Sequence, residues 1–380
     1  MFYLNVNFNV NQNYTMNNSN NIPIKTENLF DNKSINNNIS KENTSIFYSK
    51  SQKDLLSDIL KKSMNNDAVK VDDIDIIDPK TKEPKKIVNI NSLCQKGFAG
   101  PGIKKINQDN FFIYHNFLNN PDYYFMGVCD GHGMYGHDIS AYLVYNLPLN
   151  VNNIIQSELI NNFTPEKINK LSPLITHSFL RTNLDITNNE KLDSIFSGST
   201  CVSIIYTPQK LLCVNVGDSR GVIGKFDGKN WFAKNLSNDH KPNDPIERER
   251  ILINDGRIEA YRDENGEFVG PLRVWLKDED VPGLAMSRSF GDEVAHTVGV
   301  CSLPEIKEYS FLHEDKFIIL ASDGIWEFIS NEECVQIVKD YYIKDDMEAC
   351  LNYLYKEATK RWIMEEEVID DITVILIFLK

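Results

Sequence analysis

The chain has 380 residues, which is enough for one large domain or two ordinary ones. A hydrophobic share of 42% and an aromatic share of 11% are typical of a globular protein with a sizeable core. The formal charge of −14 excludes nucleic acid as an expected partner, because backbone phosphates would repel the chain. Such an acidic excess belongs either to a solvated surface or to carboxylates that gather to hold cations.

Cysteine usage and the lack of long apolar runs restrict the class of protein further. The seven cysteines are scattered and form no Cys-x-x-Cys pair, which disfavours a disulfide framework and a thiolate zinc site. No stretch approaches the roughly 18 apolar residues of a membrane span. The first residues lack the basic segment and apolar run of a secretory signal. We therefore expect no membrane partner and a cytoplasmic or nuclear location.

Three segments follow one another along the chain. Residues 1–46 are predicted to form a disordered extension, because fifteen of the first 45 residues are asparagine. Residues 47–85 are predicted to form an amphipathic helix and a linker, because four Leu and Ile side chains between positions 55 and 60 share one helical face. Residues 86–380 are predicted to form the domain that carries the chemistry.

Strand and helix patterns fill this third segment. Apolar runs bounded by Gly, Asp, Asn or Pro predict strands at Phe111–Tyr114, Tyr123–Cys129, Thr200–Tyr206, Leu211–Val216, Lys316–Ala321 and Ile372–Leu379. Helical spacing of apolar residues predicts helices at His137–Asn146, Lys167–Leu184, Pro245–Asn254, Glu332–Tyr342 and Met347–Trp362. Because strands and helices do not alternate regularly, the pattern favours an antiparallel, layered α+β domain.

Aspartates recur at the ends of these predicted strands. Asp130, Asp218 and Asp323 follow apolar runs, whereas Asp109 and Asp370 precede them. A single aspartate in such a place is usually a turn residue. Several on one rim would repel one another unless cations neutralised them. All-oxygen ligands suit Mg²⁺ or Mn²⁺, and two such ions can bind phosphate and ionise a bridging water.

A histidine lies inside one of these acidic motifs, Asp130-Gly131-His132-Gly133. Histidine titrates near neutral pH, so His132 can donate a proton to a departing alkoxide. An isolated histidine in a loop is more often a structural hydrogen-bonding group. Its position two residues after Asp130 favours the role of a general acid.

Nine motifs in chain order resemble the protein phosphatase 2C family, also called the PPM family. They are Asn107-Gln108-Asp109, Asp130-Gly131-His132-Gly133 with Gly136, Ser197-Gly198-Ser199-Thr200, Val216-Gly217-Asp218-Ser219-Arg220, Asp239-His240-Lys241-Pro242, Leu284 to Asp292, Pro304-Glu305-Ile306, Ser322 to Glu327 and Asp370-Asp371-Ile372-Thr373. The resemblance implies a four-layer αββα sandwich, in which helices flank two antiparallel β-sheets. It also implies a monomeric, metal-dependent protein serine/threonine phosphatase that acts on phosphoproteins.

The resemblance also assigns roles to individual residues. Asp130, Asp323 and Asp370 match the acidic ligands of one Mg²⁺ or Mn²⁺ ion. Asp130 also bridges to a second ion, to which Gly131 contributes its carbonyl oxygen. Asp218, together with Asp323, matches the ligands of a weaker third ion. His132 matches the proposed general acid, and Asp109 belongs to the catalytic set.

Two positions depart from the family pattern. Gln108 stands where many members have glutamate, and a neutral amide has less charge with which to hold a metal or its waters. Lys104 has the spacing of the phosphate-binding arginine, and Lys105 is a second candidate. Lysine keeps the positive charge but lacks the bidentate geometry of a guanidinium.

Other classes of phosphatase need motifs that this chain does not match. A cysteine-based phosphatase needs Cys-x5-Arg, and Arg220 lies one position too far from Cys213. A calcineurin-like enzyme needs a Gly-Asn-His-Glu motif, which the chain lacks. The remaining alternative is a pseudophosphatase that binds phosphoproteins or regulates a partner. The presence of all five aspartates favours an active enzyme.

The resembling family has a flap beside the metal cleft, and here it falls within Asn243–Asp292. Its charged, turn-rich centre predicts a surface loop. In one interpretation, Arg273, Val274 and Trp275 offer a cation and an apolar face to a phosphopeptide. In the alternative interpretation, Trp275 only anchors the flap.

Overall fold

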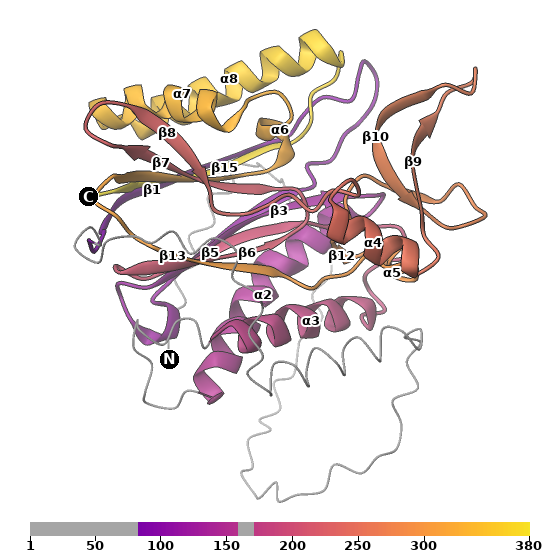
Figure 1. The fold of residues 1–380 in the computed structure, drawn as a ribbon, viewed down its shortest axis with the longest axis horizontal. Coiled ribbons are helices and arrows are strands. Elements are labelled where there is room, and N and C mark those ends of the chain that lie inside the picture. The colour runs from indigo at the N-terminus through magenta and orange to yellow at the C-terminus, as the bar shows by residue number, and fades with distance from the viewer. Residues whose placement is uncertain (1–82, 159–170) are drawn as a thin grey trace, which may run out of the picture.

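A computed structural model describes residues 83–158 and 171–380. The predicted extension at 1–46 and most of the predicted helix and linker at 47–85 lie outside these residues. The end of the linker lies on the folded body, since the Lys85 N–H donates a 2.7 Å hydrogen bond to the carbonyl of Pro208. Two β-sheets stack face to face, and helices cover both outer faces (Figure 1). The predicted four-layer αββα fold is therefore confirmed.

The first sheet has seven strands and is antiparallel throughout. Its order is β12-β4-β3-β5-β6-β13, with β2 also paired to β3. Its strands are β2 (Asp109–His115), β3 (Tyr124–His132), β4 (Gly198–Ser199), β5 (Cys201–Tyr206), β6 (Lys210–Val216), β12 (Phe290–Gly291) and β13 (Glu305–Ser310). A short 3-10 helix, η2 (Phe117–Asn119), connects β2 to β3.

The second sheet has five antiparallel strands in the order β1-β15-β14-β7-β8. They are β1 (Ile87–Gln95), β7 (Arg220–Phe226), β8 (Trp231–Asn235), β14 (Asp315–Ala321) and β15 (Ile372–Leu379). In this sheet β15 lies between β1 and β14, and both are distant from it in the sequence. The sheet is therefore complete only when β15 is in place.

The apolar runs of the central strands are buried on both faces. In β14, Ile318 and Leu320 face the other sheet, whereas Phe317 and Ile319 face the covering helices. This alternation follows from the two-residue period of a strand. Each strand therefore contributes to two separate cores, which explains why its sequence is almost continuously apolar.

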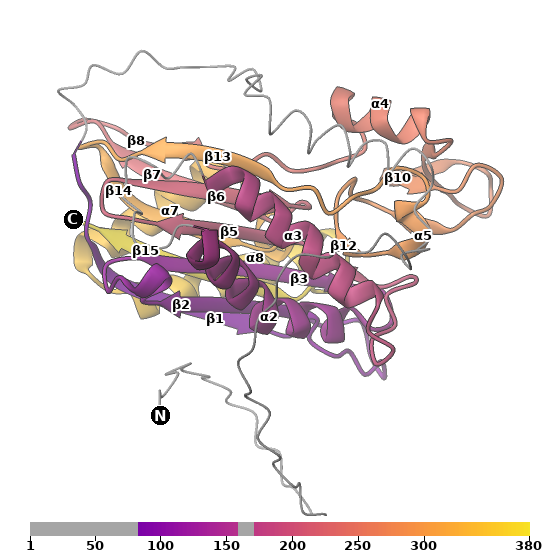
Figure 2. The ribbon, with the colours of Figure 1, turned by 90° about the horizontal axis from the view of Figure 1, so that it is seen from below.

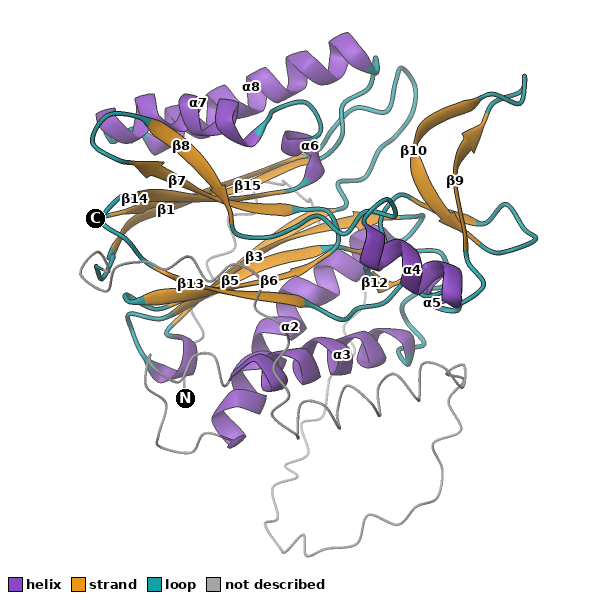
Figure 3. Ribbon diagram, viewed as in Figure 1, coloured by secondary structure: helices purple, strands orange, loops and turns teal. Residues whose placement is uncertain are grey.

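Two pairs of helices complete the outer layers (Figure 3). Figure 2 shows α2 (Gly136–Glu158) and α3 (Ser172–Thr187) lying across the seven-stranded sheet. On the five-stranded sheet lie α7 (Asn331–Lys344) and α8 (Met347–Glu365), with the short α6 (Asp323–Trp326) beside them. No helix among the described residues combines the length and apolar character needed to cross a membrane.

The charged stretches at 263–267 and 277–280 lie at the surface outside any strand, as predicted, but the strands beside them were not predicted. The segment between positions 243 and 292 forms a three-stranded antiparallel sheet of its own, together with two helices (Figure 1). Its elements are α4 (Pro245–Ile253), β9 (Arg257–Arg262), β10 (Phe268–Trp275), β11 (Pro282–Leu284) and α5 (Glu293–His296), the last just beyond the segment. Ile251, Ile258 and Val274 form a small core in this segment. The charged turn at 263–267 interrupts the apolar pattern, so the core is not evident from the sequence.

Candidate active site

Five aspartates predicted from the sequence lie together at one end of the sandwich. Asp109 begins β2 and stands opposite Asp130 of β3 in the antiparallel register. Asp323 begins α6 directly after β14. Asp218 lies in the turn between β6 and β7, and Asp370 lies two residues before β15. The carboxyl group of Asp130 interacts electrostatically with all four of the others, so the two sheets bring the predicted acids into one cluster.

Burial and crowded negative charge raise the pKa of three of these carboxyl groups, those of Asp109, Asp130 and Asp323. Burial, followed by the charges of its four neighbours, raises the pKa of Asp130 well above its usual value. Burial and the charge of Asp218 act on the pKa of Asp323 in the same direction. Burial raises the pKa of Asp109 to about 7, although a 2.7 Å hydrogen bond from the Ser322 hydroxyl opposes the shift. The cluster is therefore suited to bind positive charge.

Three carboxylate oxygens of the cluster are buried without a hydrogen-bond donor among the described residues. They are Asp109 Oδ1, Asp218 Oδ1 and Asp323 Oδ1. An unpartnered buried charge is costly, and carboxylate oxygens are the ligands that Mg²⁺ and Mn²⁺ prefer. Within the described residues, no group of three or more Asp, Glu, His or Cys side chains is arranged to hold a metal ion by itself. Because Mg²⁺ usually keeps several of its waters, an ion among these oxygens would complete its coordination with water.

The backbone around Gly131 requires glycine. A Cβ atom at this position would lie 2.4 Å from the Gly136 carbonyl oxygen and 2.6 Å from that of Gln108. Gln108 itself braces the loop, since its side-chain Nε2 donates a 2.7 Å hydrogen bond to the carbonyl of Gly133. The Gln108 side chain therefore has a structural role in this loop that does not require a metal ion.

Two lysines are paired with the acids. Lys105 Nζ lies 2.7 Å from Asp370 Oδ1 and 3.4 Å from Asp371 Oδ1. Burial alone would lower the pKa of Lys105, but the charge of Asp370 outweighs it and the pKa is raised. Lys241 forms an ion pair with Asp218. Lys104 is exposed, so of the two lysines considered for phosphate binding, Lys105 is the one that contacts the cluster.

His132 is held by a carboxylate that the sequence did not single out. Its Nε2 lies 2.6 Å from Asp292 Oδ2, and the Ser289 hydroxyl donates a 2.5 Å hydrogen bond to the same oxygen. Burial alone would lower the pKa of His132, but the negative charge of Asp292 outweighs it and the pKa is raised. The protonated ring is therefore favoured, as a proton donor requires. Asp292 ends the Ser-Phe-Gly-Asp motif, which was the signal available in the sequence.

Comparison with known proteins agrees with this geometry. Residues 96–363 match the family model described as Protein phosphatase 2C. The chain is 33% identical over 298 residues to Probable protein phosphatase 2C 73 of Arabidopsis thaliana, and the match covers 74% of this chain and 78% of that protein. The chain belongs to the protein phosphatase 2C family. Membership makes it a protein serine/threonine phosphatase, as the sequence predicted.

Further relatives of this phosphatase agree. The chain is 32% identical over 340 residues to Probable protein phosphatase 2C 38 of Oryza sativa subsp. japonica, and the match covers 79% of this chain and 72% of that protein. Its fold is similar to that of a serine-threonine phosphatase 2C from Toxoplasma gondii, with a TM-score of 0.64 and 21% identity. That match covers 79% of this chain and 98% of the other.

The flap of this phosphatase resolves the two interpretations of Trp275. The ring is only 8% exposed, and its Nε1 donates a 3.0 Å hydrogen bond to the carbonyl of Glu259. The Arg257 guanidinium lies over the ring, 5.6 Å from its centroid. Arg273 donates to the carbonyl of Gly283 at 2.8 Å. Trp275 thus anchors the flap, and its predicted contact with a phosphopeptide is wrong because the ring is buried within the flap sheet.

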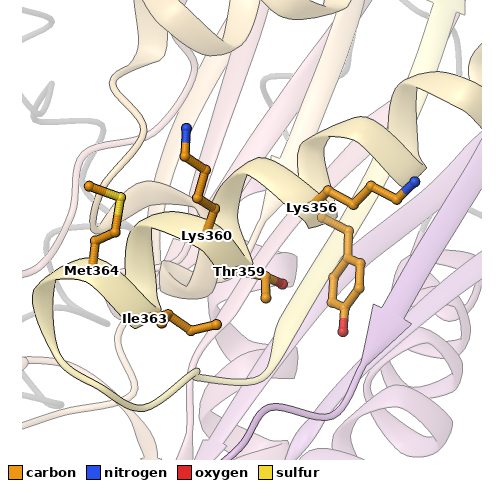
Figure 4. A pocket seen from close by; sticks show the side chains of 6 residues that line it. Lys356, Thr359, Lys360, Ile363 and Met364 are labelled. Atoms are coloured by element: carbon orange, nitrogen blue, oxygen red, sulfur yellow. The ribbon is translucent and has the colours of Figure 1, made fainter.

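Two surface hollows of the phosphatase lie outside the acidic cluster. One, of about 390 Å³, lies along α8 and is lined by Tyr355, Lys356, Thr359, Lys360, Ile363 and Met364 (Figure 4). The other, of about 440 Å³, lies along α4. Each is formed by one helix and includes none of the five clustered aspartates, so neither adds a group to the site.

Proposed function

We propose that this phosphatase hydrolyses phosphoserine and phosphothreonine in proteins with two Mg²⁺ or Mn²⁺ ions bound among its aspartates. The observation that carries the proposal is the cluster of buried carboxylates, three of whose oxygens accept no hydrogen bond from the described residues. In addition, His132 is hydrogen-bonded to Asp292 and can serve as a proton donor.

The ligand assignment uses oxygen atoms of this cluster. Asp130, Asp323 and Asp370 would hold one ion, and Asp130 and the Gly131 carbonyl would hold the other. Asp218 and Asp323 would hold a weaker third. When bound, the ions would supply positive charge for the phosphate and lower the pKa of a water that attacks phosphorus.

Two other side chains would act on the phosphate and its surroundings. Lys105 has the charge to bind a phosphate oxygen, and Lys104 is the alternative at the neighbouring position. Asp109 keeps Oδ2 in its hydrogen bond with Ser322, while Oδ1 accepts no hydrogen bond within the described part of the chain. We assign to Asp109 Oδ1 the role of orienting water inside the cluster.

His132 would protonate the departing serine or threonine oxygen. Its Nε2 is occupied by Asp292, whereas its Nδ1 is buried without a partner among the described residues. In the protonated ring, the Nε2–H donates to Asp292 and the Nδ1–H remains to be transferred. Because an alkoxide is a strong base, this proton matters most for serine and threonine esters.

Phosphate release from a phosphothreonine peptide in the presence of Mn²⁺ tests the proposal. An active phosphatase releases phosphate with added Mn²⁺ and none after chelation. A pseudophosphatase binds the peptide without releasing phosphate, and that result would contradict the proposal.

A further inference from the structure

Four large apolar side chains near His132 are exposed to solvent. They are Met134, Tyr135, Ile195 and Phe196, which are 77%, 38%, 50% and 50% exposed. Isolated exposed apolar residues are common on protein surfaces, whereas several gathered beside an active site mark an interaction surface. We call these four residues the apolar rim.

The rim is made of two segments joined by their backbones. One follows β3 and the other precedes β4. The Tyr135 N–H donates a 3.0 Å hydrogen bond to Ser197 Oγ. A Cβ atom on Gly133 would lie only 2.3 Å from the Phe196 carbonyl oxygen, so the two backbones are in direct contact. The two segments that carry the four exposed side chains therefore lie side by side.

The rim is built onto the segment that holds the proposed proton donor. The carbonyl of Ser197 accepts a 3.0 Å hydrogen bond from the N–H of Asp292, whose carboxylate pairs with His132. The carbonyl of Ile195 accepts a 3.2 Å hydrogen bond from the N–H of Val294. The position of the rim relative to the imidazole is therefore fixed by the backbone.

The chemistry of the leaving group determines what meets this rim. A general acid must come within about 3 Å of the oxygen that departs, and that oxygen belongs to the substrate's serine or threonine. The substrate backbone must therefore pass on the His132 side of the site. Met134 is two residues from His132, so their Cα atoms are at most about 7 Å apart. An extended peptide advances about 3.3 Å per residue, so residues within two positions of the phosphorylated one reach the rim.

The rim differs in charge from the rest of the site. Elsewhere the acids are paired with Lys105 and Lys241. The rim segments, residues 133–138 and 193–197, contain two aspartates, Asp138 and Asp193, and no lysine or arginine. The rim therefore has no cation to attract acidic side chains of a substrate, whereas its exposed Met and Phe gain from covering apolar ones.

We propose that the apolar rim binds apolar side chains of the substrate within two positions of the phosphorylated serine or threonine. The inference rests on the proposed function, because it requires phosphopeptide hydrolysis at the acidic cluster. Met134 and Phe196 are then specificity-determining residues that take no part in bond breaking.

Two phosphothreonine peptides test the proposal. They are identical except that leucine in one replaces serine in the other on both sides of the phosphothreonine. We expect the wild-type enzyme to prefer the leucine peptide in kcat/KM by roughly 4- to 15-fold, the effect of burying one or two methylene groups. The double variant Met134→Ser, Phe196→Ser should raise KM for the leucine peptide by a similar factor. Its kcat, and its turnover of p-nitrophenyl phosphate, should stay the same, as expected for the loss of uniform binding.

Met364→Ser is the matched control, because Met364 is 70% exposed but lies on α8 outside the cluster (Figure 4). It should leave the preference for leucine intact. Equal kcat/KM for the two peptides in an active wild-type enzyme would overturn the rim proposal alone. If wild-type protein with Mn²⁺ released phosphate from neither peptide, the proposed function itself would fail. A fall in kcat on both peptides and on p-nitrophenyl phosphate would instead make the rim a support of the cluster and overturn its substrate role.

Discussion

Replacing Asp292 by asparagine should slow the hydrolysis of phosphopeptides while sparing aryl phosphates. The Asp292 carboxylate is 2% exposed and lies 2.6 Å from His132 Nε2. Asparagine keeps the shape but removes the charge that raises the pKa of His132. Asp292 has a left-handed backbone with φ of 47°, a conformation that asparagine also tolerates, so the loop should be retained.

The size of the effect follows from the bond that is lost. A hydrogen bond to a charged group contributes about 1.5–3 kcal/mol, which corresponds to roughly 10- to 150-fold in rate if the bond acts in the transition state. That is smaller than the roughly 10²- to 10⁴-fold effect of removing a general acid. Asp292→Asn should therefore lower kcat on a phosphothreonine peptide by about 10- to 150-fold. It should lower kcat on p-nitrophenyl phosphate far less, because that leaving group needs no proton.

The assay compares the two substrates for each variant at saturating Mn²⁺. Asp345→Asn is the matched control, because Asp345 also has a left-handed backbone, with φ of 55°, but is exposed at the end of α7. It should leave both rates unchanged. An equal loss on both substrates for Asp292→Asn would refute the positioning role and indicate damage to the cluster instead.

Four further predictions concern the acidic cluster, the flap and the N-terminal extension. Asp323→Asn should nearly abolish turnover at limiting Mn²⁺. The melting temperature of the metal-free variant should stay the same or rise, because repulsion between carboxylates is relieved. Wild-type turnover in this variant would contradict the assignment of Asp323 as a metal ligand. Glu247→Gln should destabilise the fold by about 3–5 kcal/mol, because it breaks buried ion pairs. The Glu247 carboxylate lies 2.9 Å from Arg250 Nη1 and 2.6 Å from Arg288 Nη2. A melting temperature equal to that of the wild type would show that these ion pairs contribute nothing. Burial alone would raise the pKa of Glu247, but hydrogen bonds from these arginines outweigh burial and lower it. The stabilisation that the Glu247 carboxylate provides is therefore present above about pH 4.5 and is lost as the pH falls further. If Glu247→Gln unfolded in acid as the wild type does, this reasoning would be wrong. Removing residues 1–46 should leave peptide hydrolysis and melting temperature unchanged, and a large drop in melting temperature would show that the segment docks on the domain.

Most of the strands that the sequence predicted are buried on both faces, and the half-buried β2 is the exception. β14 and β15 are continuously apolar because each contributes to two cores. β7 was missed because Gly224 interrupts its pattern. A Cβ at Gly224 would lie 2.1 Å from the Phe317 ring, so packing against β14 requires the glycine that conceals the strand. β1, β8 and β13 were missed because edge strands keep polar residues on an exposed side.

The part of the active site that could be predicted is the part in which one residue type recurs at a recognisable place in the sequence. The sequence predicted aspartates at strand ends, whereas the fold brings them together, as the register of β2 and β3 does for Asp109 and Asp130. The partner of His132 was not predictable from spacing, since Asp292 is 160 residues away in the chain. Trp275 was ambiguous because an aromatic ring suits both a docking face and a small core, and only the fold distinguishes them.

Counting the Mn²⁺ ions bound to metal-free protein tests the central claim most directly. Calorimetric titration of the wild-type chain should give two ions per chain and a weaker third, and Asp130→Asn should lose the shared ligand and bind fewer. Two tight sites that vanish with Asp130 would support the carboxylate cluster as the metal centre. A wild-type chain that binds no Mn²⁺, or an Asp130→Asn variant that binds as many ions as the wild type, would contradict it.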